Sequence, residues 1–180
     1  MKIIIQSVLV FITIVIAGIS FAGVSTKVPF SEIEEKLNAK FPKELEIGQY
    51  GLQTDGVRLS RYSDDFLTIT VAADIFGLSE PLNVQVSANT KFLLKDGKLH
   101  LDEVIDPDVQ ITFGNSRQSL LEKLATTQAV SFIQNKLNEF TGDFVVHDLT
   151  KKEGFAAKFI KFSKIDKLVD DGVIIKFKLF

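Results

Sequence analysis

The sequence predicts an α+β fold in which a long, strongly curved antiparallel sheet wraps around a long amphipathic helix, with a short N-terminal and a short C-terminal helix. From Phe66 to Leu94, interrupted by one turn, apolar and polar residues alternate, which is the period of half-buried strands. From Arg117 to Phe140 apolar residues recur every three or four positions, which is helix spacing. A stripe with a spacing of four drifts by about 40° per step, so a twisted sheet would follow it better than a flat one.

Composition excludes several classes of function. The chain has 180 residues, of which 21 are basic and 23 acidic, so no excess of positive charge indicates a nucleic-acid partner. It has no cysteine, which excludes disulfides, thiolate zinc sites and a cysteine nucleophile. The length suits a single domain with a substantial core.

Residues 1–22 have the parts of a secretory signal peptide. Lys2 precedes an apolar stretch from Ile3 to Ile16, and Ser20 and Ala22 suit the small-residue positions of a cleavage site. We therefore expect cleavage after Ala22, a periplasmic protein, and one exported domain over residues 23–180. The alternative is an uncleaved inner-membrane anchor, because the longer apolar stretch from Ile3 to Ala22 approaches the roughly 20 residues that span a bilayer.

The first helix is predicted to start at Ser31. Ser31 and Glu34 have the spacing of a capping box, in which each side chain bonds to the other residue's backbone N–H. Ile33, Leu37 and Phe41 lie four residues apart on one face, and a proline follows them. After this helix the period changes to two, which predicts strands around residues 45–47 and 57–59.

Further strands and a tight hairpin follow. The segments 66–76 and 82–94 alternate over their whole lengths, with one face buried and one solvated. Asp96-Gly97 is the pair that two-residue hairpin turns prefer, because both positions need positive φ. The return strand is predicted from Leu99, with the same alternation resuming at 109–113.

The last third of the chain is predicted to form strands around a short basic helix. Strand spacing returns at 144–149 and again at 173–179. Between them, a helix over Glu153–Ser163 would carry three phenylalanines on one arc and lysines on the other. Such a helix suits peripheral contact with a membrane surface, or packing of its phenylalanines on the sheet with its lysines in water.

Four segments together resemble a known family. They are Ser31–Asn38, Ala73–Gly77, Lys95–Val109 and Asp171–Phe177. With them the chain resembles the YceB-like lipoproteins of the Gram-negative envelope, a domain of unknown function. The resemblance implies a periplasm-facing domain whose curved sheet wraps a long helix, similar to the tubular lipid-binding fold. The chain departs from that family at its front end, where no lipobox cysteine follows the apolar stretch.

The sequence offers little for catalysis, and we expect no enzyme and no cofactor. His100 and His147 are the only histidines, and without a nucleophile motif nearby they are interpreted as surface residues. Asp102, Glu103, Asp106 and Asp108 crowd carboxylates into one turn region. They lack the spacing of a calcium loop, so a solvated acidic turn is favoured over a calcium site and no metal site is predicted.

Two non-enzymatic functions remain. In the first, a lipid or other hydrophobic ligand lies between sheet and long helix, where the small residues Ala125 and Ala129 could leave room. The predicted ligand-binding residues of this seam are Leu121, Ala125, Gln128, Ala129 and Phe132. In the second, the seam is fully packed, and the protein is an envelope scaffold or interaction module that binds a protein partner.

Overall fold

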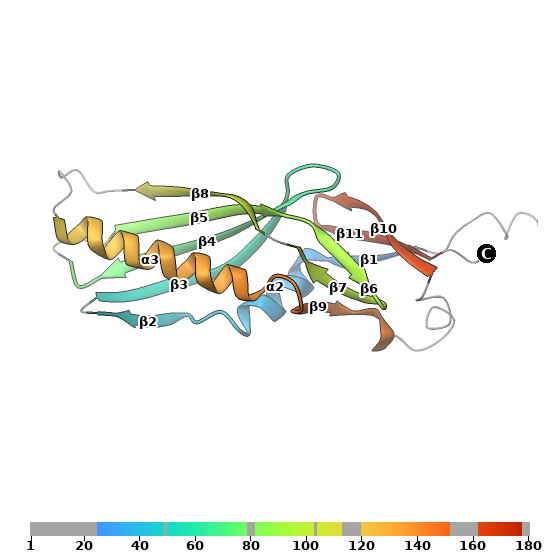
Figure 1. Ribbon diagram of the computed structural model, residues 1–180, viewed down its shortest axis with the longest axis horizontal. Helices are drawn as coiled ribbons and strands as arrows, with labels where there is room; N and C mark the ends of the chain where they lie inside the picture. Colours follow the sequence, from blue (N-terminus) through green and yellow to red (C-terminus); the bar gives the residue numbers. More distant parts are fainter. Residues whose placement is uncertain are drawn as a thin grey trace, which may run out of the picture.

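The computed structural model describes residues 25–48, 50–78, 82–102, 104–112, 120–151 and 162–177. Within these residues strands predominate, with two α-helices and one 3-10 turn (Figure 1). The elements are β1 Ser25–Pro29, α2 Phe30–Asn38, β2 Glu44–Ile47, β3 Tyr50–Arg61, β4 Leu67–Phe76, β5 Leu82–Thr90, β6 Phe92–Lys95, β7 Lys98–Leu101, β8 Ile105–Thr112, α3 Leu120–Glu139, β9 Val145–Asp148, η1 Leu149–Lys151, β10 Ser163–Val169 and β11 Gly172–Phe177.

The predicted fold class is wrong. The described strands form three separate sheets, in the orders β2-β3-β4-β5-β8, β6-β7-β9 and β1-β11-β10, and α3 lies along one face of the first sheet without being wrapped by it (Figure 1). The alternation over 82–94 was interpreted as one strand, but β5 ends at Thr90 and β6 joins a different sheet. The alternation of apolar and polar residues continues across the point where the chain leaves one sheet for another. The sequence pattern therefore suggested a single strand.

Most of the short C-terminal helix of that fold class falls outside the part of the chain that the structure describes. Residues 153–161 of the predicted Glu153–Ser163 helix lie there, and so does the membrane contact proposed for them. Ser163, the last residue of the predicted helix, begins strand β10 and pairs with Phe177 of β11. Residues 1–22, with the predicted cleavage site, also lie outside the described part.

The five-stranded sheet carries the alternation that the sequence predicted. Every second residue of β4 and β5 is buried, from Leu67 to Ile75 and from Leu82 to Thr90. β4 pairs with β3 on one side and with β5 on the other, all antiparallel. The predicted Asp96-Gly97 hairpin is confirmed as well: both residues have positive φ, 50° and 74°, between β6 and β7.

Helix α2 covers the edge of β3 beyond the end of β2. Asn38 accepts a hydrogen bond from the Val57 N–H (2.5 Å) and donates one to the Val57 carbonyl (3.1 Å). One turn earlier, Glu34 accepts the Leu59 N–H at 2.6 Å. Residues four apart on a helix and two apart on a strand both advance about 6 Å, so the two ladders match.

The predicted capping box is therefore wrong. Helix α2 begins at Phe30, and its N-cap Pro29 makes no side-chain cap hydrogen bond. The Phe30 N–H donates instead to the carbonyl of Asp171 (2.9 Å). Glu34, which was expected to bond back to Ser31, bonds to the backbone of β3 instead. The Leu59 N–H, which is distant in sequence, therefore takes the place of the predicted local partner, the Ser31 N–H.

The three sheets share one apolar core. The ring centroids of Phe30 in α2 and Phe92 in β6 lie 6.4 Å apart, and those of Phe41 and of Phe140, just after α3, lie 6.1 Å apart. Buried residues of α2, of α3 and of all three sheets belong to the same hydrophobic cluster. α2 thus connects the five-stranded sheet to the two smaller ones.

The junction between β9 and η1 gives a first testable prediction. Asp148 accepts hydrogen bonds from the hydroxyl (2.5 Å) and the N–H (3.0 Å) of Thr150. The Thr150 hydroxyl is the main cause that lowers the pKa of Asp148 below its usual 3.8. Its stabilisation is therefore present above pH 3.8 and is lost as the pH falls through the lower folded-state pKa.

We expect Thr150→Ala to destabilise the protein near neutral pH and to have a smaller effect in acid. Urea unfolding at pH 7 and near pH 3 measures the difference, with Thr127→Ala, another exposed threonine, as the control. A cost that is the same at both pH values would contradict the role of the Asp148 carboxylate.

Candidate functional site

The predicted ligand seam on α3 is largely buried. Ala125 and Ala129 are 2% and 1% exposed and pack in the common core with Ile133. Phe132 is half-buried and Gln128 is exposed, while the side chain of Leu121 lies outside the described residues. The four that are described, Ala125, Gln128, Ala129 and Phe132, line none of the three recesses described below. A ligand site at these positions stays a prediction.

A recess of about 400 Å³ opens one to two turns further along α3. It lies between the C-terminal half of the helix, the end of β5 and the residue that precedes β8. Its lining consists of Ala88, Val104, Gln134, Asn135, Leu137, Asn138 and Thr141.

Two features of the strands position this recess. The register of β5 against β8 shifts between Ser87 and Asn89, and β5 ends at Thr90. The chain then turns away into the sheet of β6, β7 and β9, where Thr90 donates to the Asp102 carbonyl at 2.9 Å. Ala88 lies at this divergence and has only a methyl group to present toward Leu137.

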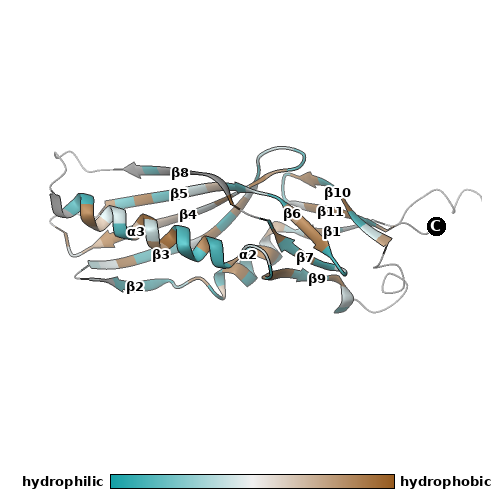
Figure 2. Cartoon of the chain, in the orientation of Figure 1, coloured by the Kyte–Doolittle hydropathy of each residue, from teal (hydrophilic) through white to brown (hydrophobic). Residues whose placement is uncertain are grey.

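The floor of the recess is apolar and its rim is polar but uncharged. Ala88 and Leu137 are buried, and Val104 is half-buried. The rim carries the carboxamides of Gln134, Asn135 and Asn138, in the part of α3 that is predominantly hydrophilic in Figure 2, and the hydroxyl of Thr141, which follows the helix. Carboxamides donate and accept hydrogen bonds at any pH. The recess can therefore bind an uncharged polar group above an apolar one, and among the described residues no side chain that lines it can serve as an acid or a base.

The rim is fixed at the end of α3. The Thr141 hydroxyl donates to the Asn138 carbonyl (2.8 Å), and the N–H of Gly142 donates to the Leu101 carbonyl of β7 (2.9 Å). Gly142 has φ 73°, a conformation that favours glycine after a helix. These bonds hold the last turn of the helix against the second sheet.

A second recess lies at the β3–β4 hairpin, where Arg61 makes the main contacts. Arg61 pairs with Asp64 and donates to Asp170 of the β10–β11 turn at 3.2 Å. These carboxylates, with Asp64 first, raise the pKa of the Arg61 guanidinium above its usual range. The contacts join the hairpin to the β10–β11 turn, which is a structural role.

The interpretation of both histidines as surface residues is wrong. His100 and His147 are 8% and 5% exposed, because consecutive residues of β7 and β9 are buried and not every second one. His147 Nδ1 lies 2.8 Å from a carboxylate oxygen of Glu32 in α2. This contact joins α2 to the second sheet.

The acidic turn is only partly described. Asp102 is half-buried, and its N–H donates to the Lys91 carbonyl at 2.8 Å. Asp108 is exposed, whereas Glu103 and the side chain of Asp106 lie outside the described residues. In the part of the chain that the structure describes, no three histidine, aspartate or glutamate side chains are grouped as metal ligands.

Sequence reasoning missed the rim of the recess beside α3. Gln134, Asn135 and Asn138 were not singled out from the sequence. The signal that could have identified them is their residue type. Three carboxamide side chains within five residues are unusual on a helix face where lysine and glutamate are better helix formers.

Neither helix of the described residues is long and apolar enough to cross a bilayer. Comparison with known proteins gave no matching family model and no matching curated protein.

Proposed function

We propose that this chain is an exported, non-enzymatic binding protein that holds a lipid or another amphipathic molecule beside α3. The recess with the uncharged rim carries this proposal. Its volume of about 400 Å³ falls within the roughly 300–1,000 Å³ of small-molecule sites. The resemblance to envelope lipoproteins and the secretory signal in residues 1–22 support an envelope role.

The lining favours a particular kind of ligand. Ala88, Val104 and Leu137 would contact an apolar chain, and the carboxamides of Asn135 and Asn138 would bond to an uncharged head group. A carboxylate or phosphate would lose water there without gaining a cation from the described lining, which contains no lysine or arginine. A neutral glyceride head group therefore fits better than a fatty acid.

A blocking substitution tests this proposal. Asn138 is exposed, so Asn138→Trp keeps the fold while its indole fills the recess. We expect the affinity for the neutral fluorophore N-phenyl-1-naphthylamine to fall about tenfold, which is about 1.4 kcal/mol. In the parent protein, monodecanoylglycerol should displace the fluorophore at lower concentration than decanoate does.

The matched control is Ser131→Trp. Ser131 is exposed on the same helix seven residues earlier and does not line the recess, so this variant should bind the fluorophore as the parent does. Equal loss in both variants, or no binding by the parent protein, would contradict the proposal.

A packed scaffold is the second candidate, and the burial of Ala125 and Ala129 favours it. Native mass spectrometry of protein purified from the envelope separates the two functions. A bound lipid that is lost in Asn138→Trp supports a carrier, whereas a mass equal to the bare chain supports a scaffold.

A further inference from the structure

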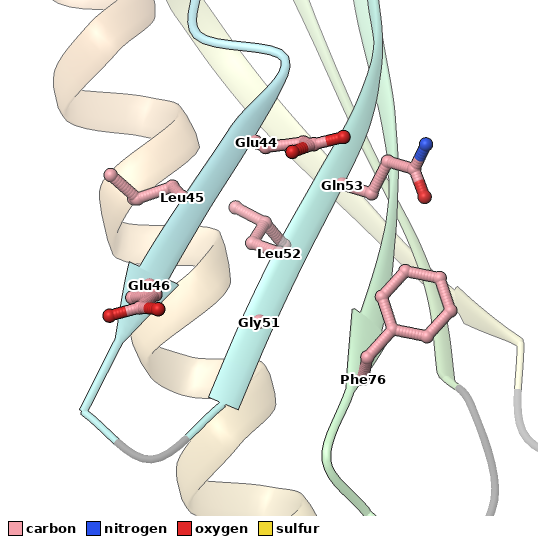
Figure 3. Close-up of a pocket in the computed structure, with 7 residues that line it drawn as sticks. All are labelled: Glu44, Leu45, Glu46, Gly51, Leu52, Gln53 and Phe76. Atoms are coloured by element: carbon pink, nitrogen blue, oxygen red, sulfur yellow. The ribbon is translucent and has the colours of Figure 1, made fainter.

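A separate recess of about 350 Å³ lies on the face of the five-stranded sheet that is turned away from α3. The strand register places Gly51 of β3 directly between Glu46 of β2 and Phe76 of β4. Gly51 has no side chain, so a gap remains between its two neighbours. Figure 3 shows this arrangement, with α3 behind the strands.

Phe76 is an anomaly on this face. The outward residues of β4 and β5 alternate as small or polar side chains from Thr68 to Asp74 and from Asn83 to Asn89. Phe76 closes the row with its ring 40% exposed. Among the described residues of β3, β4 and β5, no other large apolar side chain lies on this face. Part of its exposure follows from Gly51, which leaves one side of the ring uncovered.

The charge around the ring is negative. Glu44 and Glu46 line the recess and are exposed, and Asp74 lies in the next row, across Gln53 from Glu44. Asn83 donates to Asp74 at 3.0 Å. Within the described part of the chain, no ion pair neutralises Glu44, Glu46 or Asp74.

An aromatic face beside carboxylates attracts organic cations. The ring quadrupole is negative over its face, and a planar guanidinium can stack there while its N–H groups bond to a carboxylate. A metal ion fits poorly, because Ca²⁺ needs six to eight oxygen ligands in a defined arrangement and phenylalanine supplies none.

We propose that this recess binds an arginine side chain that a protein partner presents to the outer face of the sheet. The guanidinium would stack on Phe76, and Glu46 and Glu44 would accept its hydrogen bonds. The absence of a side chain at Gly51 provides the depth that an arginine stem needs. This interface is independent of the recess beside α3, since the two lie on opposite faces of the sheet.

A capped arginine peptide tests the proposal. The probe is acetyl-Gly-Arg-Gly-amide, titrated into the ¹⁵N-labelled exported chain and followed by amide chemical shifts. We expect saturable shifts at Gly51, Phe76 and Glu46. The same peptide with citrulline in place of arginine, which keeps the shape without the charge, should bind at least tenfold more weakly.

Variants and a second cation sharpen the result. The double variant Glu44→Gln/Glu46→Gln and the single variant Phe76→Leu should each weaken binding several-fold. Glu35→Gln, at an exposed position of α2, should leave binding unchanged. Equal binding of the citrulline peptide, or shifts that persist in the double glutamine variant, would overturn the proposal. Binding of choline as tightly as the arginine peptide would also overturn it, in favour of a small-cation site.

Discussion

Replacing Ile133 by alanine is expected to lower the free energy of unfolding by about 2–5 kcal/mol, the usual cost of truncating a buried isoleucine. Ile133 is 0% exposed and lies in the middle of α3, between Ala129 and Leu137 in the core. The surrounding core is apolar and closed to solvent, so the deletion leaves an empty cavity. Urea unfolding followed by circular dichroism measures the change.

Ser131→Ala is the matched control for Ile133→Ala. Ser131 lies two residues earlier on the exposed side of α3, and its truncation should change the free energy of unfolding by less than about 0.5 kcal/mol. If Ile133→Ala were as mild as its control, α3 would not be docked on the sheet. The recess beside its C-terminal half would then lack a wall.

The sequence predicted the local elements of this fold well where one physical signal dominated. The buried positions of β4 and β5 follow from strict alternation, and the Asp96-Gly97 turn follows from the need for positive φ. Two of the three segments with helical apolar spacing coincide with α2 and α3, and most of the third lies outside the described residues. These signals depend on neighbours within a few residues, which is why a single sequence contains them.

The arrangement of these elements could not be predicted in the same way. The break at Lys91, which sends β6 into another sheet, leaves the alternation from Leu82 to Leu94 intact. Glu34 and His147 were misjudged because their partners, Leu59 and Glu32, are distant in sequence. Burial of both sides of β7 depends on what packs against it, which the pattern of β7 alone does not record.

The candidate sites were harder still to predict. The recess beside α3 exists because β5 diverges from β8, and the recess above Gly51 exists because a glycine faces Phe76 across the strand register. Both depend on pairing between strands. Residue types alone indicated Ala125 and Ala129, which are buried in the common core, and a ligand site beside them stays a prediction.

Replacing Gly56 by alanine is expected to destabilise the protein by about 2–4 kcal/mol. Gly56 has φ +91°, and a Cβ built on it would lie 2.5 Å from Oδ1 of Asn38. It forms the bulge in β3, where the register against β4 shifts between Thr54 and Gly56. The bulge changes which residues face the core, from Leu52 and Thr54 before it to Val57 and Leu59 after it.

Two energetic terms are therefore expected to combine in Gly56→Ala. A non-glycine residue at this φ costs about 1–3 kcal/mol. Displacement of Asn38 would leave the Val57 N–H and carbonyl without their partner, which costs about 1–3 kcal/mol more for a buried group and less here because Asn38 is half-buried. Gly51→Ala is the control on the same strand, since its Cβ would make only ordinary contact, 3.9 Å from Phe76.

The two terms can be separated with Asn38→Ala. In that background the steric conflict is gone, so Gly56→Ala should cost only the backbone strain, and the two substitutions should be less than additive in urea unfolding. Additive costs would mean that Asn38 does not exclude the Cβ. Gly56→Ala would then act through its φ alone, and the contact of α2 with the edge of β3 would not depend on this glycine.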